Sequence, residues 1–266
     1  MKHWAWQVKR KLNNKSVIYH IWLNFMGGTS LGKSTMIDKI CAPMEDFKTR
    51  TPIAKLFDDT KEIQSLINKK VNDLSEELPL FCYYSTSRLA PPKREDYGTV
   101  SKNKLNDRRC GYIGCMENNL DIKALKTWCF KMEMAAFQQN KQIAEYQAFK
   151  EIVADFMYQM NELEEKPQVT YSRAFEDIVY TENGETIPVN YLSAGYQSLL
   201  WMVMDMAFRM AILNPGKASL NQCEGIVLID EVDMHLHPKW QWKIVDALQK
   251  SFPKIQFILA THSPII

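Results

Sequence analysis

A short segment near the amino terminus has the residue types and spacing of a phosphate-binding loop. Residues 27–35 read GGTSLGKST and match G-x-x-x-x-G-K-[ST], in which backbone N–H groups turn inward around phosphates. The lysine would reach the β- and γ-phosphates of a nucleotide, and the serine hydroxyl would join the shell of a bound Mg²⁺. The expected nucleotide-binding residues are Gly27, Gly28, Thr29, Ser30, Leu31, Gly32, Lys33, Ser34 and Thr35.

The elements around this loop fit the same chemistry. Residues 17–25 are apolar and β-prone, and residues 36–40 can continue a helix whose amino terminus points at the phosphates. Strand, glycine loop and helix are the context that the motif requires.

Two carboxylates follow an aliphatic run much later in the chain. Residues 225–229 (GIVLI) predict a strand buried on both faces, as in a parallel sheet. Asp230 suits the Mg²⁺ shell together with Ser34, either directly or through water. Glu231 suits the group that orients and deprotonates an attacking water. The alternative is a structural strand end without a catalytic role.

Two further polar positions lie at the ends of predicted elements. Ser193 is a good N-cap for the long apolar helix that follows, and Ser193, Gly195 and the helix amino terminus together offer an anion site. A plain capped helix is the alternative. Residues 255–260 predict another buried strand, and His262 after it could donate to a γ-phosphate oxygen.

Other candidates keep more than one interpretation. Arg88, after the predicted strand LPLFCYY, would contact phosphate, contact a facing subunit, or lie on the surface as an ordinary arginine. His235 and His237 could bind a metal, or form a polar turn at a subunit interface. Cys110 and Cys115 could bind zinc, although reduced cytosolic thiols are the simpler interpretation.

Length and composition limit the choice of class. The chain has 266 residues, 46% of them hydrophobic, which fits one large α/β domain or one domain with an insertion. The net charge of +2 indicates no particular partner. Residues 1–14 predict a basic amphipathic helix for nucleic acid or a membrane, or a partly ordered terminus. Residues 199–213 are too short to span a bilayer, and no signal peptide is present, so we expect a soluble cytoplasmic protein.

The middle of the chain changes from polar to helical. Residues 90–107 predict a loop, and residues 121–165 predict two helices broken near 138–141. Three short strands are then expected at residues 168–171, 178–180 and 186–189, with Asn183 and Gly184 as a hairpin turn.

The segments YLSAGYQSLL, GIVLIDEVDMHLHPKWQ and FILATHSP make the sequence similar to a known family. It resembles the ABC-type ATPase heads of the SMC/RecF/OLD-like P-loop superfamily. More narrowly, it resembles bacterial AAA-labelled ATP-binding proteins of DNA-repair and antiphage-defence type. The resemblance is dense over residues 189–264, covers residues 27–35, and is weak in the helical insertion.

The resemblance implies an α/β P-loop NTPase fold with a mostly parallel central sheet. One ATPase domain would cover residues 1–266, with a loop and helical subdomain at about 90–166, between the phosphate-binding loop and the signature motif. Residues 192–198 correspond to that signature, Asp233 lies in the D-loop, and His262 is the switch histidine. Family members hydrolyse ATP as head-to-tail dimers, so Ser193 and Gly195 would act in trans.

The chain also departs from the family pattern. Thr29 and Ser30 replace the usual Asn and Gly, and residues 1–16 do not resemble the paired amino-terminal strands of these heads. No convincing Q-loop glutamine is found. The chain stops at Ile266, shortly after the switch histidine, where relatives continue, which suggests truncation.

Three functions follow from these residues. The leading one is an ATPase using ATP and Mg²⁺, with Glu231, His262 and Lys33 as catalytic residues, coupling homodimerisation to DNA maintenance, DNA repair or antiphage defence. The alternative is a low-turnover nucleotide switch or scaffold that regulates a partner effector nuclease. A transporter subunit is disfavoured because no membrane-partner surface is seen, and DNA binding stays open.

Overall fold

The structure is a computed structural model that describes residues 3–12, 15–24, 75–86, 88, 108–115 and 120–266. The chain divides into two compact units, residues 1–64 and 65–266. Each unit is described by itself, and the expected single ATPase domain over residues 1–266 stays a prediction.

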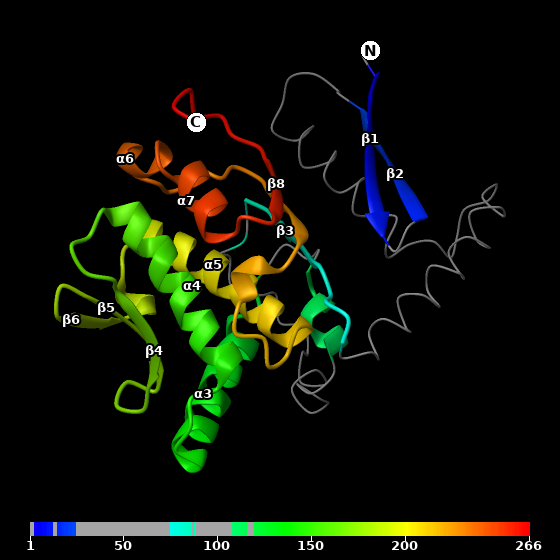
Figure 1. The fold of residues 1–266 in the computed structure, drawn as a ribbon. Coiled ribbons are helices and arrows are strands. Elements are labelled where there is room, and N and C mark those ends of the chain that lie inside the picture. The colour runs from blue at the N-terminus through cyan, green and yellow to red at the C-terminus, as the bar shows by residue number, and fades with distance from the viewer. Residues whose placement is uncertain (1–2, 13–14, 25–74, 87, 89–107, 116–119) are drawn as a thin grey trace. The chain divides into compact units, whose positions relative to one another are not determined.

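The described part of the first unit is an antiparallel strand pair (Figure 1). β1 (His3–Leu12) pairs with β2 (Lys15–Asn24) along its whole length. The expectations of a helix or loose terminus over residues 1–14, and of a lead-in without paired strands, are therefore wrong. Trp4, Trp6 and Val8 recur at every second position, and aromatic and β-branched residues at this period favour a strand.

A parallel sheet forms the centre of the second unit. Its order is β3 (Leu80–Tyr84), β7 (Gly225–Ile229), β8 (Ile255–Leu259). The central strand is β7, as its aliphatic run predicts. The sequence predicts that β8 is buried, but β8 lies at the end of the described sheet. Its residues alternate between a buried or half-buried side and an exposed side, to which Ile258 belongs with 41% exposure.

Helix α5 (Ala194–Leu213) is buried along almost its whole length and packs against β3, α3 and α4. Its two charged residues are paired with each other and with the sheet. Nε of Arg209 donates to Oδ2 of Asp205 at 2.7 Å, and the Tyr84 hydroxyl donates to the same oxygen at 2.8 Å. Among the described helices, none is both long and apolar enough to cross a bilayer.

The two predicted helices and the hairpin are confirmed. α3 (Ile122–Gln139) and α4 (Ala144–Asn161) are separated at Asn140, which has a left-handed φ of 46°. α4 packs against both α5 and the antiparallel sheet β4–β5–β6 (Figure 1). That sheet consists of β4 (Gln168–Ser172), β5 (Asp177–Glu182) and β6 (Glu185–Pro188).

The turn between β5 and β6 has the backbone that its sequence predicts. Asn183 and Gly184 have φ values of 51° and 82°, and positive φ at both central residues is the requirement of a type I′ hairpin. The remaining described elements are α6 (Pro238–Gln241), α7 (Ile244–Ser251) and short 3₁₀ turns at Arg108–Tyr112, Val189–Tyr191 and Leu220–Gln222.

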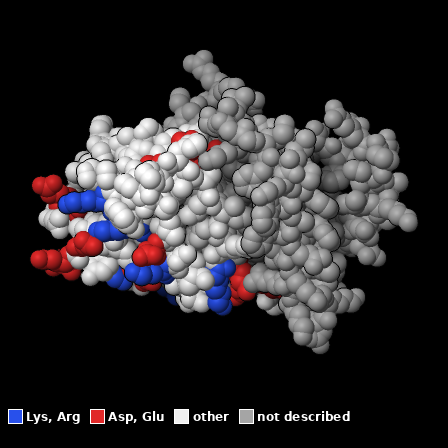
Figure 2. All heavy atoms as spheres, turned by 90° about the horizontal axis from the view of Figure 1, so that it is seen from above, with Lys and Arg blue, Asp and Glu red and all other residues white. Residues whose placement is uncertain are grey.

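The predicted α/β class is thus confirmed by a parallel sheet with helices packed on it. On the face shown in Figure 2, lysines and arginines of the described residues are interspersed with carboxylates. This mixture agrees with the net charge of +2.

An aromatic cluster joins the helical insertion to α5. The ring of Trp128 lies 5.2 Å from Phe149 and 5.4 Å from Phe208, both edge-on, and Trp128 is 1% exposed. Trp128→Ala should lower the free energy of unfolding by about 3–5 kcal/mol, because it leaves a cavity between three helices. Urea denaturation measures this change. Phe137→Ala on the same helix, where the ring is 72% exposed, is the matched control and should stay within about 0.5 kcal/mol of wild type.

Candidate functional site

Asp230 lies at the carboxyl end of the central strand. Its N–H donates to the carbonyl of Tyr84 at 2.8 Å, which extends the ladder between β7 and β3 by one residue. Asp230 is only 3% exposed, so its carboxylate lies at a buried edge of the sheet. Carboxylate oxygens are ligands that Mg²⁺ prefers, and this donor fits the predicted metal role.

Glu231 begins a tight turn directly after β7. Its φ of 45° is in the left-handed region, which non-glycine residues adopt rarely and at an energetic cost. The Met234 N–H closes the turn on the Glu231 carbonyl at 2.9 Å, and the Val232 N–H donates to the Ala260 carbonyl at 3.0 Å. The turn is therefore held by the end of β8 as well as by its own residues.

His262 approaches Glu231 from the neighbouring strand end. Nε2 of His262 lies 3.6 Å from Oε1 of Glu231, and the two side chains are 55% and 32% exposed. Because β7 and β8 are parallel, their carboxyl ends meet at one edge of the sheet. The structure thus brings Asp230, Glu231 and His262 to one edge of the sheet, where Glu231 and His262 are reached by solvent and Asp230 is buried.

Side-chain hydrogen bonds hold the loop that carries His262. The Thr261 hydroxyl donates to Oδ1 of Asp233 at 2.5 Å and accepts from the Ser263 N–H at 2.9 Å. The Ser263 hydroxyl donates to Oε1 of Gln241 at 2.7 Å. Sequence reasoning missed these supporting residues, and the only available signal was the pair of hydroxyl residues on either side of the histidine.

The start of α5 packs against the loop that follows Glu231. The Ser193 hydroxyl accepts from the Tyr196 N–H at 3.5 Å, which confirms the predicted cap. A Cβ on Gly195 would lie 2.8 Å from the carbonyl oxygen of His235, so glycine is needed at this approach. The hydrogen bond of the Ser193 hydroxyl is thus made within the first turn of its own helix.

Tyr196 links the first turn of α5 to three other elements. Its hydroxyl accepts from Nδ2 of Asn161 at 2.9 Å and lies 3.4 Å from the Glu182 carboxylate. Its ring packs edge-on against Trp240 at 4.8 Å. Helix α5 is therefore fixed at its amino terminus to α4, β5 and α6, which the sequence motif did not indicate.

Arg88 is buried, which contradicts the prediction of an ordinary surface arginine. It is 2% exposed, and its guanidinium donates to the carbonyls of Asp230 at 2.9 Å and Glu231 at 3.2 Å. Burial lowers the pKa of Arg88, while the charges of Asp230, Asp233 and Glu231 counteract that shift. The sequence could not show this placement because a single arginine after a strand carries no partner information.

Among the described residues, the histidines and cysteines that could have bound a metal are not gathered into a metal site. Nδ1 of His237 accepts from the Lys239 N–H at 3.3 Å and so caps α6, whereas the His235 side chain is exposed. Cys110 and Cys115 are not joined by a disulfide bond. Within the described part of the chain, no three His, Cys, Asp or Glu side chains are grouped so that they could hold a metal ion.

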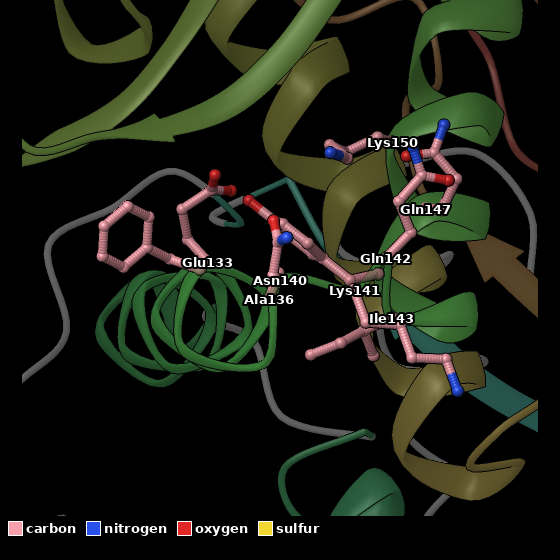
Figure 3. Close-up of a pocket in the computed structure, with 10 residues that line it drawn as sticks. Glu133, Ala136, Asn140, Lys141, Gln142, Ile143, Gln147 and Lys150 are labelled. Atoms are coloured by element: carbon pink, nitrogen blue, oxygen red, sulfur yellow. The ribbon is translucent and has the colours of Figure 1, made fainter.

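A surface pocket lies between the end of α3 and the start of α4 (Figure 3). Figure 3 shows Glu133 and Asn140 on one side, and Gln147 and Lys150 on the other. None of the predicted site residues lines it. The lining consists of Glu133, Ala136, Phe137, Asn140, Lys141, Gln142, Ile143, Tyr146, Gln147 and Lys150.

The predicted phosphate-binding loop, residues 27–35, lies outside the described residues. The roles of Lys33 and Ser34 therefore stay predictions.

Comparison with known families decides the class of the protein. Residues 46–266, which include the whole cluster at the sheet edge, match the AAA ATPase domain. The chain belongs to this family. The AAA ATPase domain match begins after residues 27–35, so the phosphate-binding loop rests on its own motif.

Curated relatives of this AAA ATPase domain are retron and Septu proteins. The chain is 29% identical over 270 residues to the retron Vc95 probable ATPase of Vibrio cholerae serotype O1 biovar El Tor, covering 86% of this chain and 50% of the relative. It is 45% identical over 92 residues to the retron Ec83 probable ATPase of Escherichia coli, covering 35% and 17%. It is 39% identical over 97 residues to Septu protein PtuA of Bacillus thuringiensis, covering 35% and 24%. The chain thus spans about half or less of the length of these relatives.

Solved structures show only a slight likeness. The SMC head domain from Thermotoga maritima is 20% identical with a TM-score of 0.33, over 45% of this chain and 39% of that one. A structure titled for ATP-driven dimerization and DNA stimulated activation of SMC ATPases is 16% identical with a TM-score of 0.33, over 44% and 69%.

Gly195→Ala should destabilise the AAA ATPase domain, because its new methyl group would push on a backbone carbonyl rather than on a flexible side chain. We expect the free energy of unfolding to fall by about 1–3 kcal/mol, measured by thermal or urea denaturation. Ala194→Ser, at the exposed neighbouring position, is the control and should change little. Equal stability of the two variants would contradict the packing of α5 on the His235 loop.

Proposed function

We propose that this chain binds ATP and hydrolyses it at the carboxyl edge of the parallel sheet. The observation that carries the proposal is the pairing of Glu231 with His262, 3.6 Å apart, directly beside the buried Asp230. This cluster lies within the matched AAA ATPase domain. A water-activating carboxylate and an imidazole beside a metal-binding carboxylate are the groups that hydrolysis of a phosphoanhydride requires.

Each residue of the proposed site has a distinct chemical task. Glu231 orients the attacking water and accepts its proton, and His262 donates to a γ-phosphate oxygen. Lys33 and the backbone of the phosphate-binding loop hold the β- and γ-phosphates. Asp230 and Ser34 would hold Mg²⁺, which supplies positive charge to the phosphates when it is bound.

We propose that two copies of the chain pair head to tail through ATP. Ser193 is exposed at the amino terminus of α5, where the helix dipole and the free N–H groups favour an anion. Its hydroxyl and the Gly195 backbone would then contact the γ-phosphate held by the partner's loop. Loss of that phosphate removes these contacts, so hydrolysis would open the dimer.

For the process, we propose antiphage defence, which is one of the processes that the sequence resemblance implies, with an effector nuclease as partner. The retron and Septu relatives support this choice over DNA repair. Phage plating on cells that carry the complete gene and its neighbours tests it. Equal plating efficiency for wild type and Glu231→Gln would contradict a role for ATP turnover in defence.

Glu231→Gln should lower the kcat for phosphate release by roughly 10²- to 10⁴-fold, because an amide cannot accept the proton of the attacking water. ATP should still raise the melting temperature of this variant by binding linkage. Lys33→Ala should lose both phosphate release and the rise in melting temperature that ATP causes. Glu185→Gln makes the same chemical change at an exposed position on β6 and should behave like wild type.

The outcomes separate the two candidate functions. Phosphate release that survives both Lys33→Ala and Glu231→Gln would exclude the proposed site. If ATP stabilises wild type but no phosphate appears, the chain is the low-turnover nucleotide switch.

Mixing two inactive variants tests the trans arrangement. Lys33→Ala disables the loop of its own chain, and Ser193→Arg disables the signature that serves the partner's loop. A head-to-tail heterodimer would combine both defects in one site and leave the other site intact. We therefore expect the mixture to recover about half of wild-type phosphate release per heterodimer, since one of the two sites is intact. No recovery, with heterodimers shown by co-purification of two differently tagged variants, would contradict the arrangement.

A further inference from the structure

We infer that Arg88 is a positioning residue for Glu231, and that it acts on the backbone of the catalytic turn rather than on the substrate. The inference rests on the proposed function of Glu231. The observations behind it are hydrogen bonds between a residue shortly after β3 and the residues after β7. The chemical steps proposed above do not involve these bonds.

The Arg88 guanidinium bonds to two successive carbonyls. Nη1 donates to the Asp230 carbonyl at 2.9 Å, and Nη2 donates to the Glu231 carbonyl at 3.2 Å. Nη1 also donates to the Ser85 carbonyl at 3.2 Å, which ties the side chain to its own strand end. The planar fork thus spans the gap between the two strand ends.

These two carbonyls belong to the peptide planes on either side of the Glu231 Cα. The orientation of the first plane sets φ of Glu231, and the orientation of the second sets ψ. A rigid fork that holds both carbonyls therefore restrains both soft torsions of this residue. No single hydrogen bond could do so.

Such a restraint is needed because Glu231 has a φ of 45°. A non-glycine residue in the left-handed region is strained by roughly 1–3 kcal/mol and persists only when its surroundings hold it. The N–H groups of Val232 and Met234 also help to hold the peptide plane after Glu231, whereas Arg88 in addition holds the plane before it. Without the fork, this first plane would turn and the backbone of Glu231 would relax toward a right-handed or extended conformation. The carboxylate would then move away from the position in which His262 Nε2 is 3.6 Å from it.

Burial makes the restraint effective. Arg88 is 2% exposed, so water competes little for its hydrogen bonds. Burial lowers the pKa of the guanidinium and the nearby carboxylates raise it, and an arginine keeps its charge at any neutral pH. Lysine would keep the charge, but its ammonium is a point donor without the planar fork.

Arg108 offers a matched control for a purely structural role. It is also buried, at 5% exposure, and also donates to backbone carbonyls, those of Leu213 at 2.5 Å and Glu76 at 2.6 Å. These carbonyls lie at the end of α5 and in the segment before β3, not in the catalytic turn. Arg108→Lys should therefore lower stability without a selective loss of turnover.

The experiment compares Arg88→Lys, Arg88→Gln and Arg108→Lys in the full chain, below the melting temperature of the least stable variant. For both Arg88 variants we expect kcat for ATP hydrolysis to fall about 10- to 100-fold, with KM within about threefold of wild type. The rise in melting temperature caused by ATP should be kept. Arg108→Lys should keep kcat within about twofold of wild type, even if its melting temperature falls as far as those of the Arg88 variants.

A double variant separates positioning from general damage. If Arg88 acts through Glu231, adding Arg88→Lys to Glu231→Gln should lower single-turnover hydrolysis no further. Additive losses would overturn the inference, and so would equal kcat in Arg88→Lys and Arg108→Lys. If wild type releases no phosphate, the proposed function fails and the inference fails with it. If wild type is active, additive losses or equal kcat values would contradict the role of Arg88 and leave the proposed function intact.

Discussion

The parallel pairing of β7 between β3 and β8 is the constraint on which the candidate site depends. The backbone ladder continues past the strands on both sides, from Asp230 to the Tyr84 carbonyl and from Val232 to the Ala260 carbonyl. These bonds place the strand ends by main-chain geometry, and the side chains of Arg88, Thr261 and Ser263 then hold the turn and the histidine loop. A site built on strand ends can therefore be exact in position, although its residues come from distant parts of the chain.

Helix α5 is attached to this sheet through β3. Its Asp205 accepts from Tyr84 on β3 and from Arg209 on the helix itself. Burial and the charge of Asp205 raise the pKa of Tyr84, so its phenol stays protonated and remains a donor. Because breaking a buried pair leaves an uncompensated charge, the sheet and the signature helix are expected to move as one body.

Local patterns predicted most of the elements, for reasons that can be named. The hairpin at Asn183 follows from backbone conformations that few residues other than Asn and Gly tolerate, and the break between α3 and α4 follows from the loss of helical period. The helix predicted for residues 1–14 is wrong, because basic charge does not select a secondary structure, whereas the two-residue period of Trp4, Trp6 and Val8 favours a strand. The burial of β8 was overestimated because composition does not show which strand ends a sheet.

By itself, the sequence determined the α/β class and where its candidate residues stand: Asp230, Glu231 and His262 at strand ends, and Ser193 at a helix start. Each of these follows from a short-range pattern of residue type and element period. Only the tertiary structure decided that Arg88 is buried, that it bonds to the backbone of Glu231, and that Gly195 lies against His235. The physical reason is that these contacts join segments far apart in the chain through backbone carbonyls, which every residue possesses and no sequence pattern distinguishes.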